Sequence, residues 1–277
     1  MDRPTAPDAL SAALAAWLPQ PGSDLYYAQL YAPPAHRRTL ALIEGLRGEI
    51  ARIPATCSSP AVALPKLAWW REELAHLARG TPRHPLTQGF TAPDPALAPA
   101  AAALVTGVEA MLGERAWPTR AARRQALAAA HGPLWKVALQ LCVDAEPVPP
   151  QAEILAIAVE EAALLRDARR FLDGGLPLVA QELVASAPAD PAFPNTSASW
   201  HARVMGADLA LLETELRAGL KALPQRRRLR PLATLAVLAI ATVAEVRADG
   251  SRVWESRVEL TPLRKLLLAW REARFAR

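Results

Sequence analysis

The chain has 277 residues, of which 52% are hydrophobic, and it carries a formal net charge of +5. Its two cysteines, Cys57 and Cys142, lie far apart and outside any CxxC pair, which argues against a disulfide framework or a structural zinc site and favours a reducing, cytoplasmic compartment. Alanine and leucine dominate the apolar residues, and both favour helix, so we expect one all-α domain over residues 1–277.

Prolines and glycines divide the sequence into helical segments. Leu40, Ile43 and Leu46 are spaced three residues apart, which predicts an amphipathic helix over 35–53 that Pro54 closes. In chain order we predict about ten helices, at about residues 7–19, from 23 onward, 35–53, 60–79, 97–113, 118–143, 151–173, 197–222, 229–247 and 261–275.

The stretches between these helices are predicted to be connections. Residues 81–99 are rich in proline, and residues 186–195 precede the helix at 197–222. Asp249-Gly250 is a turn signal, so a short hairpin with Val253 and Val258, or a loop, is expected there.

The most hydrophobic window, 231–244, is shorter than the about 20 apolar residues of a membrane span, and charged residues flank it. We therefore expect a buried core helix. The basic segment 226–230 precedes this window, and it is typical of a solvated loop between helices. It is also suited to peripheral contact with an anionic membrane surface or to binding a diphosphate. No zinc-finger spacing, RNP-like motif or glycine-rich phosphate loop accompanies it, so nucleic acid is not an expected partner.

Several motifs follow one another in a fixed order. They are Tyr26-Tyr27, Pro33-Pro34, Arg37-Arg38, Lys66-Leu67-Ala68-Trp69-Trp70-Arg71-Glu72-Glu73-Leu74, Gly80-Thr81-Pro82-Arg83-His84-Pro85, Leu164-Leu165-Arg166-Asp167 and Gly175-Leu176-Pro177. In order and spacing they resemble the motifs of the squalene/phytoene synthase family, over roughly residues 23–270. The resemblance implies an isoprenoid-synthase-type helical bundle around a central cavity.

Family members that make squalene or phytoene join two prenyl diphosphates, and they use two aspartate-rich helices that face each other across an apolar cavity. Aspartates four residues apart share one helical face and bind Mg²⁺, which neutralises the leaving diphosphate. This chain keeps two remnant positions, Glu49 and Asp167, but Ile53 stands four residues after Glu49. Arg170 and Phe171 stand where the family has a Glu-Asp pair. A cation and an aromatic ring cannot ligate Mg²⁺, so no metal site and no cofactor are expected.

Three hypotheses for function stay open. In the first, the chain is a pseudoenzyme of the family that binds a partner protein or an isoprenoid lipid in the inherited cavity. The first-motif helix, which reads Leu46-Arg47-Gly48-Glu49-Ile50, is similar to that of a branch without aspartate motifs, which includes mitochondrial complex I assembly factors.

In the second hypothesis the chain is an active prenyltransferase of terpenoid biosynthesis that uses Mg²⁺ and acts on farnesyl or geranylgeranyl diphosphate. Arginines would then hold the diphosphate by bidentate contacts in place of some of the metal. The candidates are Arg37, Arg38, Arg47, Arg166 and Arg170. The third hypothesis is an unrelated helical adaptor or nucleic-acid binder.

Aromatic residues near these motifs are candidates for the cavity lining. They are Tyr26, Tyr27, Trp69, Trp70 and Phe171. Adjacent helical residues face about 100° apart, so one of the paired tryptophans is expected in the core and the other in a groove. In an alternative interpretation, Glu49 and Asp167 are ordinary charges on helix surfaces, and Asp167 pairs with Arg166 or Arg170. Gly132 predicts close helix packing at its position.

Overall fold

The structure is a computed structural model that describes residues 14–15, 17–57, 59–114, 116–144, 146–173, 178–186, 198–250 and 257–275. Within these ranges the chain forms thirteen helices and no strand, so the predicted all-α class is confirmed. Most of the predicted helix at 7–19, most of the connection at 186–195, the Gly175-Leu176-Pro177 motif and Val253 lie outside the described residues.

The long helices follow the predicted ranges to within a few residues. In chain order the helices are α2 (Asp24–Gln29), α3 (Arg37–Ala51), α4 (Ile53–Thr56), α5 (Pro60–Ala78), α6 (Pro85–Gln88), α7 (Leu97–Gly113), α8 (Arg120–Val143), α9 (Pro150–Arg166), α10 (Ala168–Asp173), α11 (Gln181–Ser186), α12 (Ala198–Ala222), α13 (Arg230–Ala248) and α14 (Pro262–Phe275). The short helices α4, α6, α10 and α11 were not predicted as separate elements.

Two predicted helices are each divided in two. The helix at 35–53 is interrupted at Arg52 and restarts as α4, where Pro54 lies in the first turn. Pro54 therefore does not close the helix, because the N–H that proline lacks has no intrahelical partner at that position. The helix at 151–173 is interrupted at Asp167, between α9 and α10. Asp167 thus lies at a helix junction.

The proline-rich connection at 81–99 contains the helix α6, which was not predicted. The side chain of Glu73 on α5 accepts hydrogen bonds from the backbone N–H groups of Arg83 and His84, at 2.8 and 2.9 Å. The Nδ1 atom of His84 accepts one from the N–H of Leu86 at 3.2 Å. Hydrogen bonds to α5 therefore hold the turn that precedes α6, and the local sequence of residues 81–99 does not indicate these bonds.

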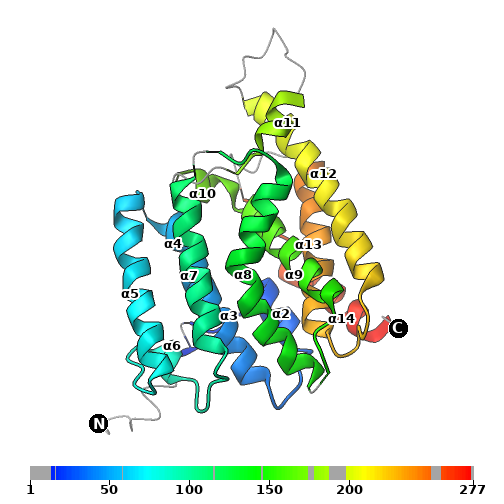
Figure 1. Ribbon diagram of the computed structural model, residues 1–277. Coiled ribbons are helices and arrows are strands. Elements are labelled where there is room, and N and C mark those ends of the chain that lie inside the picture. The colour runs from blue at the N-terminus through cyan, green and yellow to red at the C-terminus, as the bar shows by residue number, and fades with distance from the viewer. Residues whose placement is uncertain are drawn as a thin grey trace, which may run out of the picture.

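The long helices stand side by side, with α5 at one edge and α12 and α14 toward the other (Figure 1). Helix α9 packs against α8, α12 and α13, and α7 packs against α3, α5 and α8. Helices α8 and α13 have the length and hydropathy of a membrane span, but 56% of the apolar window of each is buried inside the bundle.

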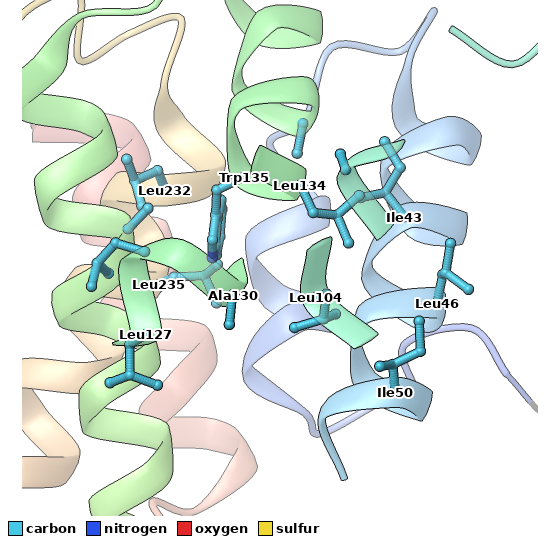
Figure 2. Packing of buried hydrophobic residues seen from close by; sticks show 14 of the residues in the cluster. Ile43, Leu46, Ile50, Leu104, Leu127, Ala130, Leu134, Trp135, Leu232 and Leu235 are labelled. Carbon is cyan, nitrogen blue, oxygen red and sulfur yellow. The ribbon is translucent and has the colours of Figure 1, made fainter. Parts of the chain in front are cut away.

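The hydrophobic core includes residues of α3, α5, α7, α8, α9, α12 and α13. Figure 2 shows the apolar side chains of α3 on one side, those of α13 on the other, and Trp135 of α8 between them. Leu46, Leu104 and Leu134 are fully buried. Each such leucine contributes on the order of 1.5–3 kcal/mol to folding.

Helices α7 and α8 approach each other closely at Gly107 of α7, where an added Cβ would overlap Ala130 of α8. The prediction of close packing at Gly132 is wrong, because nothing lies within 4 Å of a Cβ built there. Gly132 precedes Pro133 inside α8, and a side chain before proline crowds the ring when the backbone is helical. The glycine relieves that local crowding.

Candidate functional site

Two neighbouring cavities lie inside the bundle. The larger, which we call the α10 cavity, has a volume of about 240 Å³ and is lined by residues of α3, α4 and α7 to α10, together with Arg257. The smaller, the α13 cavity, has a volume of about 150 Å³ and lies between α2, α3, α9 and α13. Arg47, Glu160, Ala163 and Arg166 line both.

A buried polar cluster marks the boundary between the cavities. The guanidinium of Arg47 forms ion pairs with Glu44 on its own helix and with Glu160 on α9. It also lies over the ring of Trp135, 5.2 Å from the centroid. The indole Nε1 of Trp135 donates to Oε1 of Glu160 at 2.7 Å, and Nδ1 of His131 lies 3.5 Å from Oε2. One cation therefore serves two carboxylates.

Burial and charge set the protonation of this cluster. Burial raises the pKa of Glu44 above its ordinary value. Burial would also raise the pKa of Glu160, but Arg47, His131 and the Trp135 hydrogen bond together hold it below that value. Burial lowers the pKa of His131, and Arg47 lowers it further. The carboxylate of Glu160 acts in the opposite direction but does not outweigh them. The Arg47–Glu160 pair is thus ionised and the imidazole neutral at neutral pH.

Asp167, the remnant of the second aspartate motif, lines the α10 cavity but is already paired. Nη2 of Arg166 donates to its Oδ2 at 3.0 Å, and Nε of Arg257 lies 2.7 Å from its Oδ1. The predicted pairing with Arg166 is therefore present, and the second partner is Arg257. Arg166 also donates to Asp24 at the start of α2, at 2.9 Å.

The residues around Asp167 do not fit Mg²⁺. Magnesium needs several hard oxygen ligands, and both oxygens of Asp167 face guanidinium groups. Arg170 and Phe171, which line the same cavity, offer no oxygen. Across the described ranges, no group of three or more His, Cys, Asp or Glu side chains could hold a metal ion.

Three other predicted residues lie outside the lining of both cavities. Glu49 forms an ion pair with Arg52 at the end of α3. Arg37 donates through Nη2 to the carbonyl oxygens of Leu30 and Ala32, at 3.3 and 3.4 Å, and so ties α3 to the end of α2. Arg38 is exposed on α3.

Of the predicted aromatic residues, only Phe171 lines a cavity. Tyr26 and Tyr27 stack edge to face at 5.5 Å, and Tyr27 packs in a small cluster with residues of α13 and α14. Trp70 is buried and Trp69 is 45% exposed, as expected for adjacent helical positions. Both tryptophans contact His84, and no residue of α5 lines either cavity.

Sequence reasoning missed Glu160, His131 and Arg257. Glu160 could have been found, because it precedes Asp167 by seven residues, which is two helical turns on one face. His131 gave no signal, since it pairs with a residue of another helix. Arg257 belongs to a segment without regular structure.

A family model described as squalene/phytoene synthase matches residues 18–264 of the chain. The chain belongs to the squalene/phytoene synthase family. Two solved structures share its fold, one of a dehydrosqualene synthase in complex with a ligand and one of squalene synthase HpnC from Alicyclobacillus acidocaldarius.

The first comparison has a TM-score of 0.70 at 13% identity and covers 90% of each chain. The second has a TM-score of 0.58 at 15% identity and covers 81% of this chain and 88% of the other. No curated protein sequence matches the chain. At these identities the two structures show the isoprenoid synthase fold alone.

Proposed function

We propose that this squalene/phytoene synthase family member binds an isoprenoid lipid with an anionic head group in the α10 cavity, without metal-dependent catalysis. One observation carries the proposal. The cavity is lined by five arginines and only two carboxylates, and the carboxylates are paired with arginines from the same lining. Four of these arginines, Arg47, Arg52, Arg166 and Arg257, also pair with carboxylates outside the lining. The cation left to attract an anion is therefore Arg170, which forms no ion pair within the described ranges.

The cavity also offers the two kinds of surface that an amphiphilic ligand needs. Val108, Met111 and Leu127 supply apolar walls on one side. On the other side, the Nε atom of Arg166 is buried without a hydrogen-bond partner, and Arg170 forms no ion pair with any residue that the structure describes. Guanidinium groups bind phosphate oxygens in bidentate geometry, so these donors suit a phosphate or diphosphate.

Binding of this kind does not by itself give turnover. Arginines that are already held in place bind a diphosphate in the ground state as well as in the transition state, and uniform binding does not accelerate the chemical step. We therefore expect a stable complex with no release of diphosphate.

The test is calorimetric titration of the purified chain with farnesyl and geranylgeranyl diphosphate, in EDTA and in Mg²⁺, with an assay for inorganic diphosphate. We expect binding in EDTA and no diphosphate release in Mg²⁺. Arg170→Gln should weaken binding by roughly tenfold or more, because a hydrogen bond to a charged group contributes about 1.5–3 kcal/mol. Arg217→Gln, on an exposed part of α12, is the control and should leave affinity unchanged.

Two results would contradict the proposal. Release of diphosphate that requires Mg²⁺ would show that the chain is an active prenyltransferase. Absence of binding by both diphosphates would instead favour a partner protein as the ligand, which a pull-down at moderate salt would detect.

A further inference from the structure

Helix α14 turns its apolar side outward. Leu263, Leu266, Leu267, Trp270 and Phe275 are 75%, 42%, 52%, 49% and 66% exposed. The residues that α14 buries are Lys265, Ala269 and Glu272. A helix on the surface of a bundle normally buries its apolar stripe and exposes its charges. In α14 the arrangement is reversed.

Ion pairs hold α14 in this orientation. Nζ of Lys265 lies 2.9 Å from Oδ1 of Asp24 and donates to the carbonyl oxygen of Gly22 at 3.0 Å. At the other end, Nε and Nη2 of Arg226 donate to the two carboxylate oxygens of Glu272, at 2.7 and 2.6 Å. A rotation that buried the leucines would break both attachments.

The exposed apolar residues form one continuous stripe. Leu263, Leu266, Leu267 and Trp270 follow the spacing of three and four residues that places side chains on one helical face. Leu263 and Trp270 are seven residues apart, so the stripe is about 10 Å long. An exposed stripe of this kind is typical of a surface that contacts a partner or a membrane.

The charges beside the stripe are positive. Arg271 and Arg274 lie on α14 and form no ion pair with a residue in the described ranges. The single acidic residue of α14, Glu272, is buried. Its bonds to Arg226 place the basic segment 226–230 against the C-terminal half of the helix, where Arg227 is exposed. The surface therefore complements an anionic partner.

We propose that α14 and the basic segment 226–230 form a docking face for an anionic lipid bilayer. The helix lies in the plane of the interface, and its leucines and Trp270 enter the boundary between head groups and acyl chains. The exposed side chains of Arg227, Arg271 and Arg274 contact lipid phosphates. Amphipathic helices with arginine beside tryptophan and leucine bind membranes in this way. A bilayer suits the face better than a protein, because the stripe is a flat, single helical face with cations beside it. The inference does not depend on the ligand of the α10 cavity.

Vesicle flotation tests the proposal on the full-length chain. We expect it to float with vesicles of phosphatidylcholine and phosphatidylglycerol, less with phosphatidylcholine alone, and less at high salt. Leu267→Ser with Trp270→Ser should abolish flotation. Arg271→Gln with Arg274→Gln should weaken it by roughly fivefold per arginine. The control is Leu64→Ser with Trp69→Ser on α5, whose side chains are exposed to a similar degree, 43% and 45%.

Failure of the wild-type chain to float with anionic vesicles would overturn the proposal, and so would equal flotation of the α14 and α5 variants. Light scattering on the same samples tests whether a second copy of the chain, instead of a bilayer, binds to this face. A dimer that Leu267→Ser with Trp270→Ser dissociates, without vesicle binding, would identify the face as a subunit interface. If the serine variant loses helical circular dichroism, the arginine variant, whose side chains are exposed, decides the outcome.

Discussion

Arg47 is the central residue of the polar cluster between the two cavities. It pairs with Glu44 and Glu160, while Trp135 donates to Glu160 and His131 lies beside it. A single cation between two buried carboxylates leaves the cluster short of positive charge. Burial raises the pKa of Glu44, whereas Arg47, His131 and the Trp135 hydrogen bond hold the pKa of Glu160 below its ordinary value.

The depressed pKa of His131 predicts a loss of stability in mild acid. In the unfolded chain the imidazole takes up a proton as the pH falls below 6.5, and in the folded chain burial and Arg47 oppose this. Stability is therefore unaffected well above 6.5 and decreases below it, by up to about 1.4 kcal/mol per pH unit. His84, whose pKa burial also lowers, acts in the same direction.

Urea unfolding between about pH 7 and pH 5.5 measures this effect. His131→Asn should lose the part of the acid sensitivity that His131 contributes, so its unfolding free energy should fall less steeply than that of the wild type. The pKa of Glu160 is depressed, so its contribution to the free energy of unfolding is lost only at a pH below this range. Identical pH profiles for the two proteins would show that His131 takes up its proton over the same pH range in the folded and the unfolded chain.

Part of this site could be predicted at the level of residues. Arg47, Arg166, Arg170, Asp167 and Phe171 line the α10 cavity as the motifs indicate. By contrast Arg37, Arg38 and Glu49 do not, because the rotation of α3 aims these three residues away from the cavity and aims Arg47, Gly48 and Ala51 at it. Rotation about a helix axis depends on the neighbouring helices, and a single motif does not fix it.

At the level of elements, the contact between α7 and α8 depends on the glycine at 107. A Cβ there would overlap Ala130, whereas nothing lies within 4 Å of a Cβ built on Gly48 of α3. Gly107→Ala should lower the free energy of unfolding by about 1–3 kcal/mol, as overpacking does. Gly48→Ala should raise it by about 0.5–1 kcal/mol, because alanine favours helix. Denaturant unfolding of both variants gives the comparison.

Opposite signs for these two changes are the decisive outcome. If both variants were stabilised, α7 and α8 could separate without cost, and the close approach would not be a requirement of the fold. The sequence predicted the existence of both helices but not their contact point. The interruptions at Arg52 and Asp167 were also missed. Asp167 pairs with Arg257, which is distant in sequence, whereas the side chain of Arg52 bonds to Gly48 and Glu49 on its own helix.

On the scale of the whole molecule, an interior ion network joins three long helices. Arg123 of α8 is fully buried, donates to Glu161 of α9 at 2.5 Å, and donates to both oxygens of Asp208 of α12 at 2.7 and 2.9 Å. Alanine, leucine and proline were enough to predict the all-α class. The network was not predictable, because its members lie 38 and 85 residues apart in sequence and each resembles an ordinary surface charge.

Arg123→Met tests how much the bundle depends on this network. Methionine fills a similar volume but leaves Asp208 and Glu161 with only their less buried partners, Arg120 and Arg124, and breaking a buried ion pair from one side costs about 3–5 kcal/mol. Arg217→Met is the control, because it removes an exposed pair with Glu213, which keeps Arg247 as a partner, and should cost about 0.5 kcal/mol or less.

If denaturant unfolding of Arg123→Met shows a loss close to that of the control, Arg120 and Arg124 must supply enough positive charge to replace the missing guanidinium. The expected large loss should be partly reversed when Glu161→Gln and Asp208→Asn are added, since the uncompensated charges then disappear. Recovery of this kind would separate the electrostatic role of Arg123 from simple packing, because a packing defect would remain after both carboxylates are neutralised.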